Sequence, residues 1–249
     1  MLPIVEFKNV SKSFGPHVIF SGANLSVMKG ETLTIIGGSG KGKSVCLKLL
    51  LGLMRPDAGR VIFEGEDIGS MEEGELSRVR SHMGMLFQGS ALFDSLTVRE
   101  NVAYPIRQHF KRGEGEISRI VAKKLSMVGL PGIEEMMPAD LSGGMKKRVG
   151  LARAIAIDPQ VILYDEPTTG LDPANTRRIC NLIKELQKRL GVTSIVVTHD
   201  MDAAFSITDR IAMLHDHAFC FVGTTEEAKV STDPVVQNFI SGEMGTSDG

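Results

Sequence analysis

The sequence predicts an α/β protein with three parts: a core of alternating strands and helices, an N-terminal antiparallel β subdomain and an inserted helical subdomain. Three observations support this prediction. A glycine-rich loop at residues 37–44 joins a short apolar strand to a helix. Strand and helix patterns alternate on both sides of this loop, and the pattern becomes mainly helical between residues 89 and 138.

Composition narrows the class of protein before any motif is considered. The 249 residues are 42% hydrophobic, enough for a full core, and a net charge of −2 provides no basic field for nucleic acid. No apolar run approaches the roughly 18 residues of a membrane span, and no signal peptide is recognised. Three scattered cysteines, Cys46, Cys180 and Cys220, fit a reducing cytoplasm better than a disulfide or zinc framework.

The first third of the chain predicts a pair of strands, a buried strand and a helix. Val5–Phe14 and Val18–Val27 are expected to pair across a Gly-Pro turn. Thr32–Ile36 is a short apolar strand that leads directly into the glycine loop. A helix should follow over residues 43–54, because a Pro/Gly-rich segment then interrupts the pattern.

The rest of the chain is predicted to alternate in the same way, apart from the helical stretch. In that stretch five apolar residues recur at helical spacing: Ile117, Ile120, Val121, Leu125 and Val128. The other expected elements are strands Arg60–Glu64, Met83–Phe87, Val161–Tyr164 and Ser194–Val197, helices Glu72–Ser81 and Ala174–Leu190, a hairpin at Ile211–Val222 and a short helix at Val235–Ile240.

These elements predict a single domain over residues 1–241. Its core covers about 1–88 and 152–241, and the helical subdomain covers about 89–151. The small, polar segment 242–249 is predicted to be a disordered tail.

The glycine loop predicts a nucleotide site. It fits the pattern GxxxxGK[ST] and lies between a strand and a helix, as that motif requires. Glycines let backbone N–H groups curl toward phosphate oxygens, and the helix start adds partial positive charge. We expect Lys43 to reach the β- and γ-phosphates of ATP and Ser44 to bind Mg²⁺. The predicted loop residues are Gly37, Gly38, Ser39, Gly40, Lys41, Gly42, Lys43 and Ser44.

Polar side chains at three strand ends predict the chemistry of the site. Asp165 and Glu166 end a buried apolar strand, so both carboxylates should emerge at the edge of the sheet that carries the ligand crevice. We expect Asp165 to hold Mg²⁺ and Glu166 to orient or deprotonate the attacking water. His199 should lie near the γ-phosphate, and Gln88 should reach Mg²⁺ or the water. The structural alternative is a pair of acids that cap the turn at Pro167.

A second glycine-rich helix start is predicted at Ser142. Its hydroxyl can cap a helix that begins with Gly143 and Gly144. Three cations at residues 146–148 crowd the first turn, where positive charge opposes the helix dipole. This placement indicates either a solvated cationic turn or a helix start that binds a second phosphate group.

Together these residues resemble the motifs of the ATP-binding-cassette (ABC) ATPases, in order and spacing, over roughly residues 4–241. This resemblance implies a P-loop NTPase core, and Phe14 lies where the family places an aromatic ring on adenine. The matching motifs are the Walker A loop Gly37–Ser44, the Q-loop at Gln88, the signature Leu141–Met145, the Walker B strand Val161–Glu166, the D-loop Gly170–Asp172 and the switch histidine His199.

The resemblance implies a head-to-tail homodimer that hydrolyses two ATP molecules with Mg²⁺. Ser142 and Gly144 of one subunit would meet the γ-phosphate that Lys43 of the other subunit holds. Gly143 and Asp172 complete the implied contacts to nucleotide.

Residues 85–105 are similar to those of the ATPases that serve MCE-type lipid transporters, among them the maintenance-of-lipid-asymmetry system of Gram-negative envelopes. Met145, where most family members carry Gln, and residues 233–240 indicate the same group. The similarity implies phospholipid transport between membranes and a place at the cytoplasmic face of the inner membrane. It also implies three partners: a membrane permease, an MCE-domain lipid-binding protein and a STAS-domain protein.

One surface is a candidate for docking the permease. Leu92, Phe93, Leu96 and Tyr104 follow the Q-loop strand and could form an apolar cleft coupled to ATP through Gln88. The alternative is that they belong to the ordinary core of the subdomain.

Two other functions share the nucleotide chemistry. A solute importer of the amino-acid type would differ in its partner, and a division-type regulator would use ATP binding without transport. A DNA-repair protein is disfavoured because no sustained heptads indicate a coiled coil. The pair His215 and His217 indicates a polar turn at Asp216 rather than a metal site.

Overall fold

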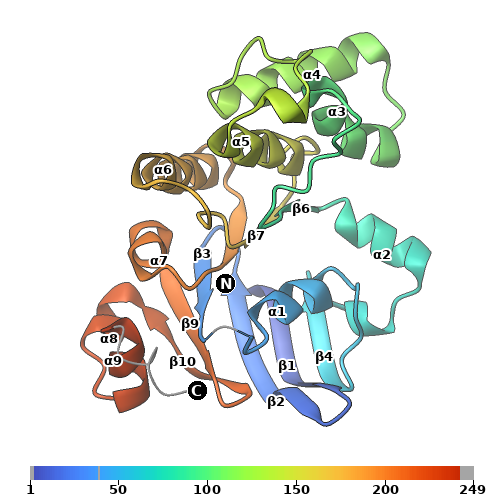
Figure 1. Ribbon diagram of the computed structural model, residues 1–249. Coiled ribbons are helices and arrows are strands. Elements are labelled where there is room, and N and C mark those ends of the chain that lie inside the picture. Colours follow the sequence, from blue (N-terminus) through green and yellow to red (C-terminus); the bar gives the residue numbers. More distant parts are fainter. Residues whose placement is uncertain (1–2, 39, 242–249) are drawn as a thin grey trace. The chain divides into compact units, whose positions relative to one another are not determined.

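The computed structural model describes residues 3–38 and 40–241, and it divides into two compact units (Figure 1). Of the described residues, the first unit combines those up to 79 with 193–241, and the second covers residues 80–192. The predicted disordered tail, 242–249, lies outside the described residues.

The first unit contains the predicted antiparallel β subdomain as a four-stranded sheet in the order β2-β1-β4-β5. Val5, Phe7 and Val10 of β1 are buried in the core, and an irregularity of the register between Phe7 and Val10 accounts for their uneven spacing. The strands are β1 (Pro3–Phe14), β2 (His17–Met28), β4 (Ala58–Phe63) and the short β5 (Glu66–Asp67).

A second, largely parallel sheet in the same unit carries the glycine loop. Its order within the unit is β10-β9-β3-β8, and β3 pairs in parallel with both β8 and β9. All five residues of β3 are buried, including the polar Thr32 and Thr34, as expected for a strand of a parallel sheet that is covered on both faces. The strands are β3 (Thr32–Ile36), β8 (Thr193–Val197), β9 (Arg210–His215) and β10 (Ala218–Thr224).

Helices complete the first unit. The last of them, α9, packs with α8 on an apolar cluster that includes Ile211 and Met213 of β9. The helices are α1 (Lys43–Leu50), α2 (Glu73–Arg80), α7 (Met201–Ile207), α8 (Thr225–Lys229) and α9 (Pro234–Ile240), with a 3-10 turn η1 (Ile68–Ser70).

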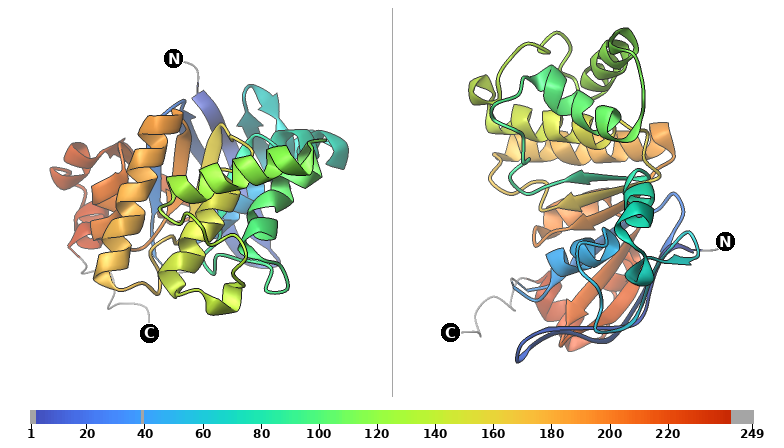
Figure 2. Two further views of the ribbon diagram at one scale, coloured as in Figure 1. Left: turned by 90° about the horizontal axis from the view of Figure 1, so that it is seen from above. Right: turned by 90° about the vertical axis from the view of Figure 1, so that its right-hand side faces the viewer.

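The second unit combines two parallel strands with four helices. Strands β6 and β7 pair in parallel, and α3, α4 and α5 pack on one another as the green and olive group in Figure 2. The elements are β6 (Met83–Leu86), α3 (Val98–His109), α4 (Glu114–Met127), the 3-10 turn η2 (Pro138–Asp140), α5 (Gly143–Ala154), β7 (Val161–Asp165) and α6 (Pro173–Leu190).

The structure corrects the sequence prediction in three places. Helix α1 ends at Leu50 and not near Met54, because Gly52 adopts a left-handed φ of 62° just after it. Residues 89–97 form turns rather than helix, and α3 begins after a capping box at Thr97. Helices α7 and α8 were not predicted, although the Thr and Glu that cap α8, at 224 and 227, are a recognisable start signal.

Gly84 should be required for the packing of β6 on α5. A Cβ added at Gly84 would lie 2.2 Å from the backbone oxygen of Ala154, and backbone cannot rotate away as a side chain can. We expect Gly84→Ala to lower the free energy of unfolding by about 1–3 kcal/mol, measured by denaturant titration. Gly89→Ala is the matched control, because an added Cβ there meets no atom of the described residues within 4 Å. Equal stability of the two variants would contradict this packing.

Candidate functional site

The glycine loop between β3 and α1 has the conformation that its sequence predicts. Gly37, Gly40 and Gly42 have φ values of 153°, 72° and 104°, which L-residues rarely adopt. At Gly37 an added Cβ would also lie 2.6 Å from the backbone oxygen of Leu214. Ser39, a predicted site residue, lies outside the described residues. The loop thus needs its glycines for backbone shape and for close approach.

Lys43 places a buried ammonium against this loop. Its Nζ donates to the backbone oxygens of Gly37 at 2.8 Å and Gly38 at 2.9 Å, and the residue is 7% exposed. Helix α1 begins at Lys43 after Gly42, and no side chain of the described residues caps it. A cation and an uncapped helix start on one curled loop suit a phosphate group, and the half-buried Ser44 lies beside them on α1. The predicted contact of Ser44 to Mg²⁺ stays a prediction.

His199 lies at the same edge of the sheet as the glycine loop. Ile35 of β3 pairs with Val197 of β8, and the N–H of Thr198 donates to the oxygen of Ile35 at 3.3 Å. His199 is therefore two residues beyond its strand, beside the residues that enter the loop. Its imidazole is exposed, and the next residue, Asp200, caps α7. The predicted position of His199 at a strand end is confirmed.

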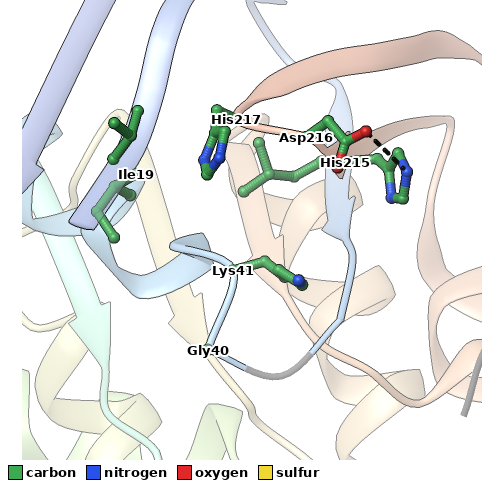
Figure 3. Close-up of a pocket in the computed structure, with 8 residues that line it drawn as sticks. Ile19, Gly40, Lys41, His215, Asp216 and His217 are labelled. Atoms are coloured by element: carbon green, nitrogen blue, oxygen red, sulfur yellow. Dashed lines mark ion pairs between the residues drawn. The ribbon is translucent and has the colours of Figure 1, made fainter. Parts of the chain in front are cut away.

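Phe14 and a small cavity belong to the first unit, the one that carries the glycine loop. Phe14 ends β1, its side chain is 42% exposed, and the ammonium of Lys12 lies 5.7 Å from the centre of its ring. An exposed aromatic face of this kind can stack on a flat base. The cavity, of about 100 Å³, is shown in Figure 3; its lining residues are Val18, Ile19, Gly40, Lys41, Leu214, His215, Asp216 and His217.

His215 and His217 lie on either side of Asp216, where the chain turns from β9 to β10. Asp216 and His217 both have positive φ, at 43° and 68°, which places them in a tight turn as predicted. Nε2 of His215 lies 3.4 Å from a carboxylate oxygen of Asp216 (Figure 3). The part of the chain that the structure describes contains no cluster of three potential metal ligands.

The acidic residues and Gln88 lie together in the second unit. Leu86 of β6 pairs with Tyr164 of β7, so Gln88 and Glu166 each stand two residues beyond that register at the same sheet edge. Gln88 is exposed and Asp165 is half-buried. Glu166 is 9% exposed, and the hydroxyl of Thr169 donates to its carboxylate at 3.2 Å. A fixed, nearly buried carboxylate at a strand end is suited to act as a base.

Helix α5 begins as predicted, with Ser142 as its cap. The Ser142 hydroxyl accepts from the N–H of Met145 at 3.3 Å. Ser142 and Gly143 are exposed, whereas Gly144 is buried, and an added Cβ there would lie 2.7 Å from Oδ1 of Asn175, so that this side chain would have to move. This helix start therefore exposes backbone and a hydroxyl to a ligand.

Asp172 caps helix α6 rather than standing alone. Its carboxylate accepts from the N–H groups of Ala174 and Asn175, both at 2.9 Å, and from the side-chain amide of Asn175 at 2.6 Å. The hydrogen bonds from Asn175 hold the pKa of Asp172 below its usual value. The predicted nucleotide contact of Asp172 stays a prediction.

Two of the three cations that follow Ser142 donate to backbone oxygens, which corrects one of the two predicted alternatives, a solvated cationic turn. Lys147 donates to the backbone oxygens of Gln88 and Glu166, and Arg148 donates to those of Val128 and Gly129. Sequence reasoning missed this, because a helix-surface count places these side chains outside and only the folded unit brings carbonyls to them.

An apolar groove lies beside the strand that leads to Gln88. Its volume is about 410 Å³. Phe93 and Tyr104, predicted for a docking face, both line it, and their ring centres are 4.8 Å apart. Leu92 and Leu96 are half-buried and are not among its lining residues. The full lining is Met83, Gly84, Met85, Phe87, Ala91, Phe93, Tyr104, Pro105, Arg153, Ala154 and Ile157.

Comparison with known proteins agrees with this geometry. The family model described as "ABC transporter" matches residues 20–169. The chain is 45% identical over 246 residues to the intermembrane phospholipid transport system ATP-binding protein MlaF of Haemophilus influenzae, covering 99% of this chain and 92% of that protein. It is 42% identical over 238 residues to a probable ribonucleotide transport ATP-binding protein, mkl, of Mycobacterium leprae, covering 96% and 69%.

Solved structures show the same fold. The ATP-binding cassette MJ0796, as a dimer in a post-hydrolysis state with ADP and Pi, matches with a TM-score of 0.81 and 32% identity. The match covers 88% of this chain and 98% of that one. Among the described residues, none of the helices combines the length and the apolar character that a membrane span requires.

Proposed function

This chain belongs to the ABC transporter family and is an ATPase, and from that premise we propose that it powers the movement of phospholipid between membranes. The observation that carries the choice of substrate is the similarity to a phospholipid-system protein along nearly the whole length of both chains. The relative that is named for ribonucleotide transport is matched over a smaller share of its length, so nucleotide transport is the second candidate.

The proposed reaction assigns one role to each predicted residue. Lys43 and the N–H groups of the loop hold the phosphates, and Phe14 stacks on the adenine. Mg²⁺, held by Ser44, Asp165 and Gln88, would neutralise charge on the phosphates.

The remaining residues serve the proton and the γ-phosphate. Glu166 takes a proton from the attacking water, and His199 stabilises the γ-phosphate as charge shifts. The support is their position: Lys43 and Ser44 begin α1, and Asp165, Glu166 and His199 lie at or just beyond the ends of β7 and β8.

We propose that two copies of the chain close head to tail over two ATP molecules. The start of α5 supports this, because Ser142 and Gly143 expose a hydroxyl and N–H groups that bind phosphate well. We also propose that each copy consists of a core, at about residues 1–88 and 152–241, and a helical subdomain, at about residues 89–151.

We propose the groove at Phe93 and Tyr104 as the docking site of a membrane permease at the cytoplasmic face of the inner membrane. Both rings are exposed, at 43% and 42%, and an apolar groove with aromatic anchors suits a partner helix. An MCE-domain protein and a STAS-domain protein complete the proposed assembly.

Loss of the Tyr104 ring should release the permease. We expect Tyr104→Ala to weaken co-purification of the permease with the tagged chain by about tenfold or more, because aromatic anchors contribute about 2 kcal/mol or more. Phe110→Ala is the matched control, since its ring is 38% exposed and does not line the groove. Equal recovery of permease with both variants would place the docking site elsewhere.

The substrate is tested by transfer from labelled vesicles. The intact complex is purified from membranes and incubated with fluorescent phospholipid in donor vesicles, with ATP or with ADP. ATP-dependent phospholipid transfer is the expected result. ATP-dependent uptake of ribonucleotides without phospholipid transfer would replace the proposal by the second candidate. A complex without any permease would favour a regulatory protein.

A further inference from the structure

Lys147 is a buried cation that joins α5 to two segments of the predicted catalytic site. The residue is 4% exposed. Its Nζ donates to the backbone oxygen of Gln88 at 2.5 Å and to that of Glu166 at 3.1 Å. The Lys147 ammonium therefore connects α5 to the Q-loop and to the segment of the proposed base within one subunit.

The segment that contains Glu166 needs this support. Glu166 adopts a left-handed φ of 48°, a conformation that costs an L-residue about 1–2 kcal/mol. Its carbonyl accepts both from Lys147 and from the N–H of Thr169, at 3.3 Å. The two donors hold the strained turn from which the carboxylate projects.

A second cation of α5 holds the Q-loop in the same way. The guanidinium of Arg153 donates to the backbone oxygens of Ser90 and Ala91, both at 2.7 Å. Ser90 and Ala91 have positive φ as well. Two cations of α5 therefore hold irregular backbone at the Q-loop. Of the two, only Lys147 also donates to the backbone oxygen of Glu166.

The ammonium of Lys147 makes this linkage specific. Burial lowers its pKa, and the nearby carboxylates of Glu166 and Asp165 act in the opposite direction. A buried charge has few alternative hydrogen-bond partners, which favours retention of the bonds to these two carbonyls. A displacement of α5 would then be transmitted to the backbone of both segments.

We propose that Lys147 is a positioning residue that couples the two ATP sites of the dimer. The inference rests on the proposed head-to-tail arrangement, in which the start of α5 meets the nucleotide of the partner subunit. Lys147 lies about one turn beyond that start. The two backbone oxygens to which it donates belong to Gln88 and Glu166, which are proposed to serve the nucleotide of the same subunit. Binding at one site would thereby align Glu166 and Gln88 at the other.

The test compares Lys147→Met with Arg148→Met in the intact complex with its permease. Both changes remove a cation that donates to two backbone oxygens, but Arg148 bonds those of Val128 and Gly129 in the turn after α4. We expect Lys147→Met to lower kcat about 10–100-fold, with KM changed less than about threefold, because loss of alignment is costly for chemistry. The Hill coefficient for ATP should fall toward 1, from a wild-type value between 1 and 2.

Two further variants separate alignment from folding. Lys147→Arg keeps a charged donor and should recover most of kcat, and Arg148→Met should lower the melting temperature while kcat and the Hill coefficient stay near wild type. If Lys147→Met does not fold, Lys147→Gln replaces it, and a smaller fall in kcat and in the Hill coefficient is expected. Unchanged kcat and Hill coefficient in the folded variant, or an equal loss in Arg148→Met, would overturn the inference.

ATP-driven dimerisation distinguishes this inference from the function on which it rests. It is measured by light scattering in the Glu166→Gln background, with and without Lys147→Met. Dimers in both chains, together with unchanged cooperativity, would defeat the role of Lys147 alone. Absence of an ATP-dependent dimer in both proteins, with and without Lys147→Met, would defeat the proposed head-to-tail dimer, and the inference with it.

Discussion

Glu166→Gln is expected to lower kcat for ATP hydrolysis by about 10²–10⁴-fold, the range typical for loss of a positioned base. Gln has the same shape as Glu but cannot accept a proton from the attacking water. The hydrogen bond from Thr169 and the turn at Glu166 should survive, so the affinity for ATP should change little. Steady-state phosphate release by the purified complex measures kcat, and nucleotide binding is titrated separately.

Glu185→Gln is the matched control for this change. Glu185 lies on α6 of the same unit, its side chain is 57% exposed, and its closest ion pair, to Arg189, is 3.9 Å long. The same chemical change there should leave kcat near wild type, because exposed pairs contribute little. If Glu166→Gln hydrolysed ATP at the normal rate, Glu166 would not be the base.

Lys43→Met should weaken ATP binding by about 10–100-fold, because a charge-assisted hydrogen bond contributes about 1.5–3 kcal/mol. Lys43 is buried in the loop, where water screens its charge poorly, so its attraction for phosphate is strong. Methionine keeps most of the chain length and removes the ammonium. Titration with a fluorescent ATP analogue gives Kd directly.

Lys48→Met is the control, since Lys48 lies on α1 five residues after Lys43 but is exposed. It should shift Kd by less than about threefold, because an exposed charge interacts weakly through water. The melting temperature of Lys43→Met without nucleotide shows whether loss of its bonds to Gly37 and Gly38 disturbs the loop. Equal effects of the two variants on Kd would contradict the assignment of Lys43 to the phosphates.

Much of the fold and many site positions could be predicted from the sequence, because the relevant signals are local. Strand Thr32–Ile36 follows from a short segment with four β-branched residues before the glycine loop, and the cap at Ser142 follows from a hydroxyl before a glycine pair. Helix Met201–Ile207 was missed, since seven residues give little periodicity and no proline marks its start, as Pro234 does for the equally short helix Pro234–Ile240. The helix was also overextended past Leu50, where the backbone of Gly52 decides the end.

The sequence by itself predicted which residues bind phosphate and which acts as the base, because the motif places Lys43 after its glycines and Glu166 after its apolar strand. Tertiary structure alone decided what the cations after Ser142 do. Lys147 is hidden in the fold, where it meets carbonyls of residues 59 positions before it and 19 positions after it in the chain. A hydrogen bond of that kind depends on where distant backbone comes to lie, and no local pattern encodes it.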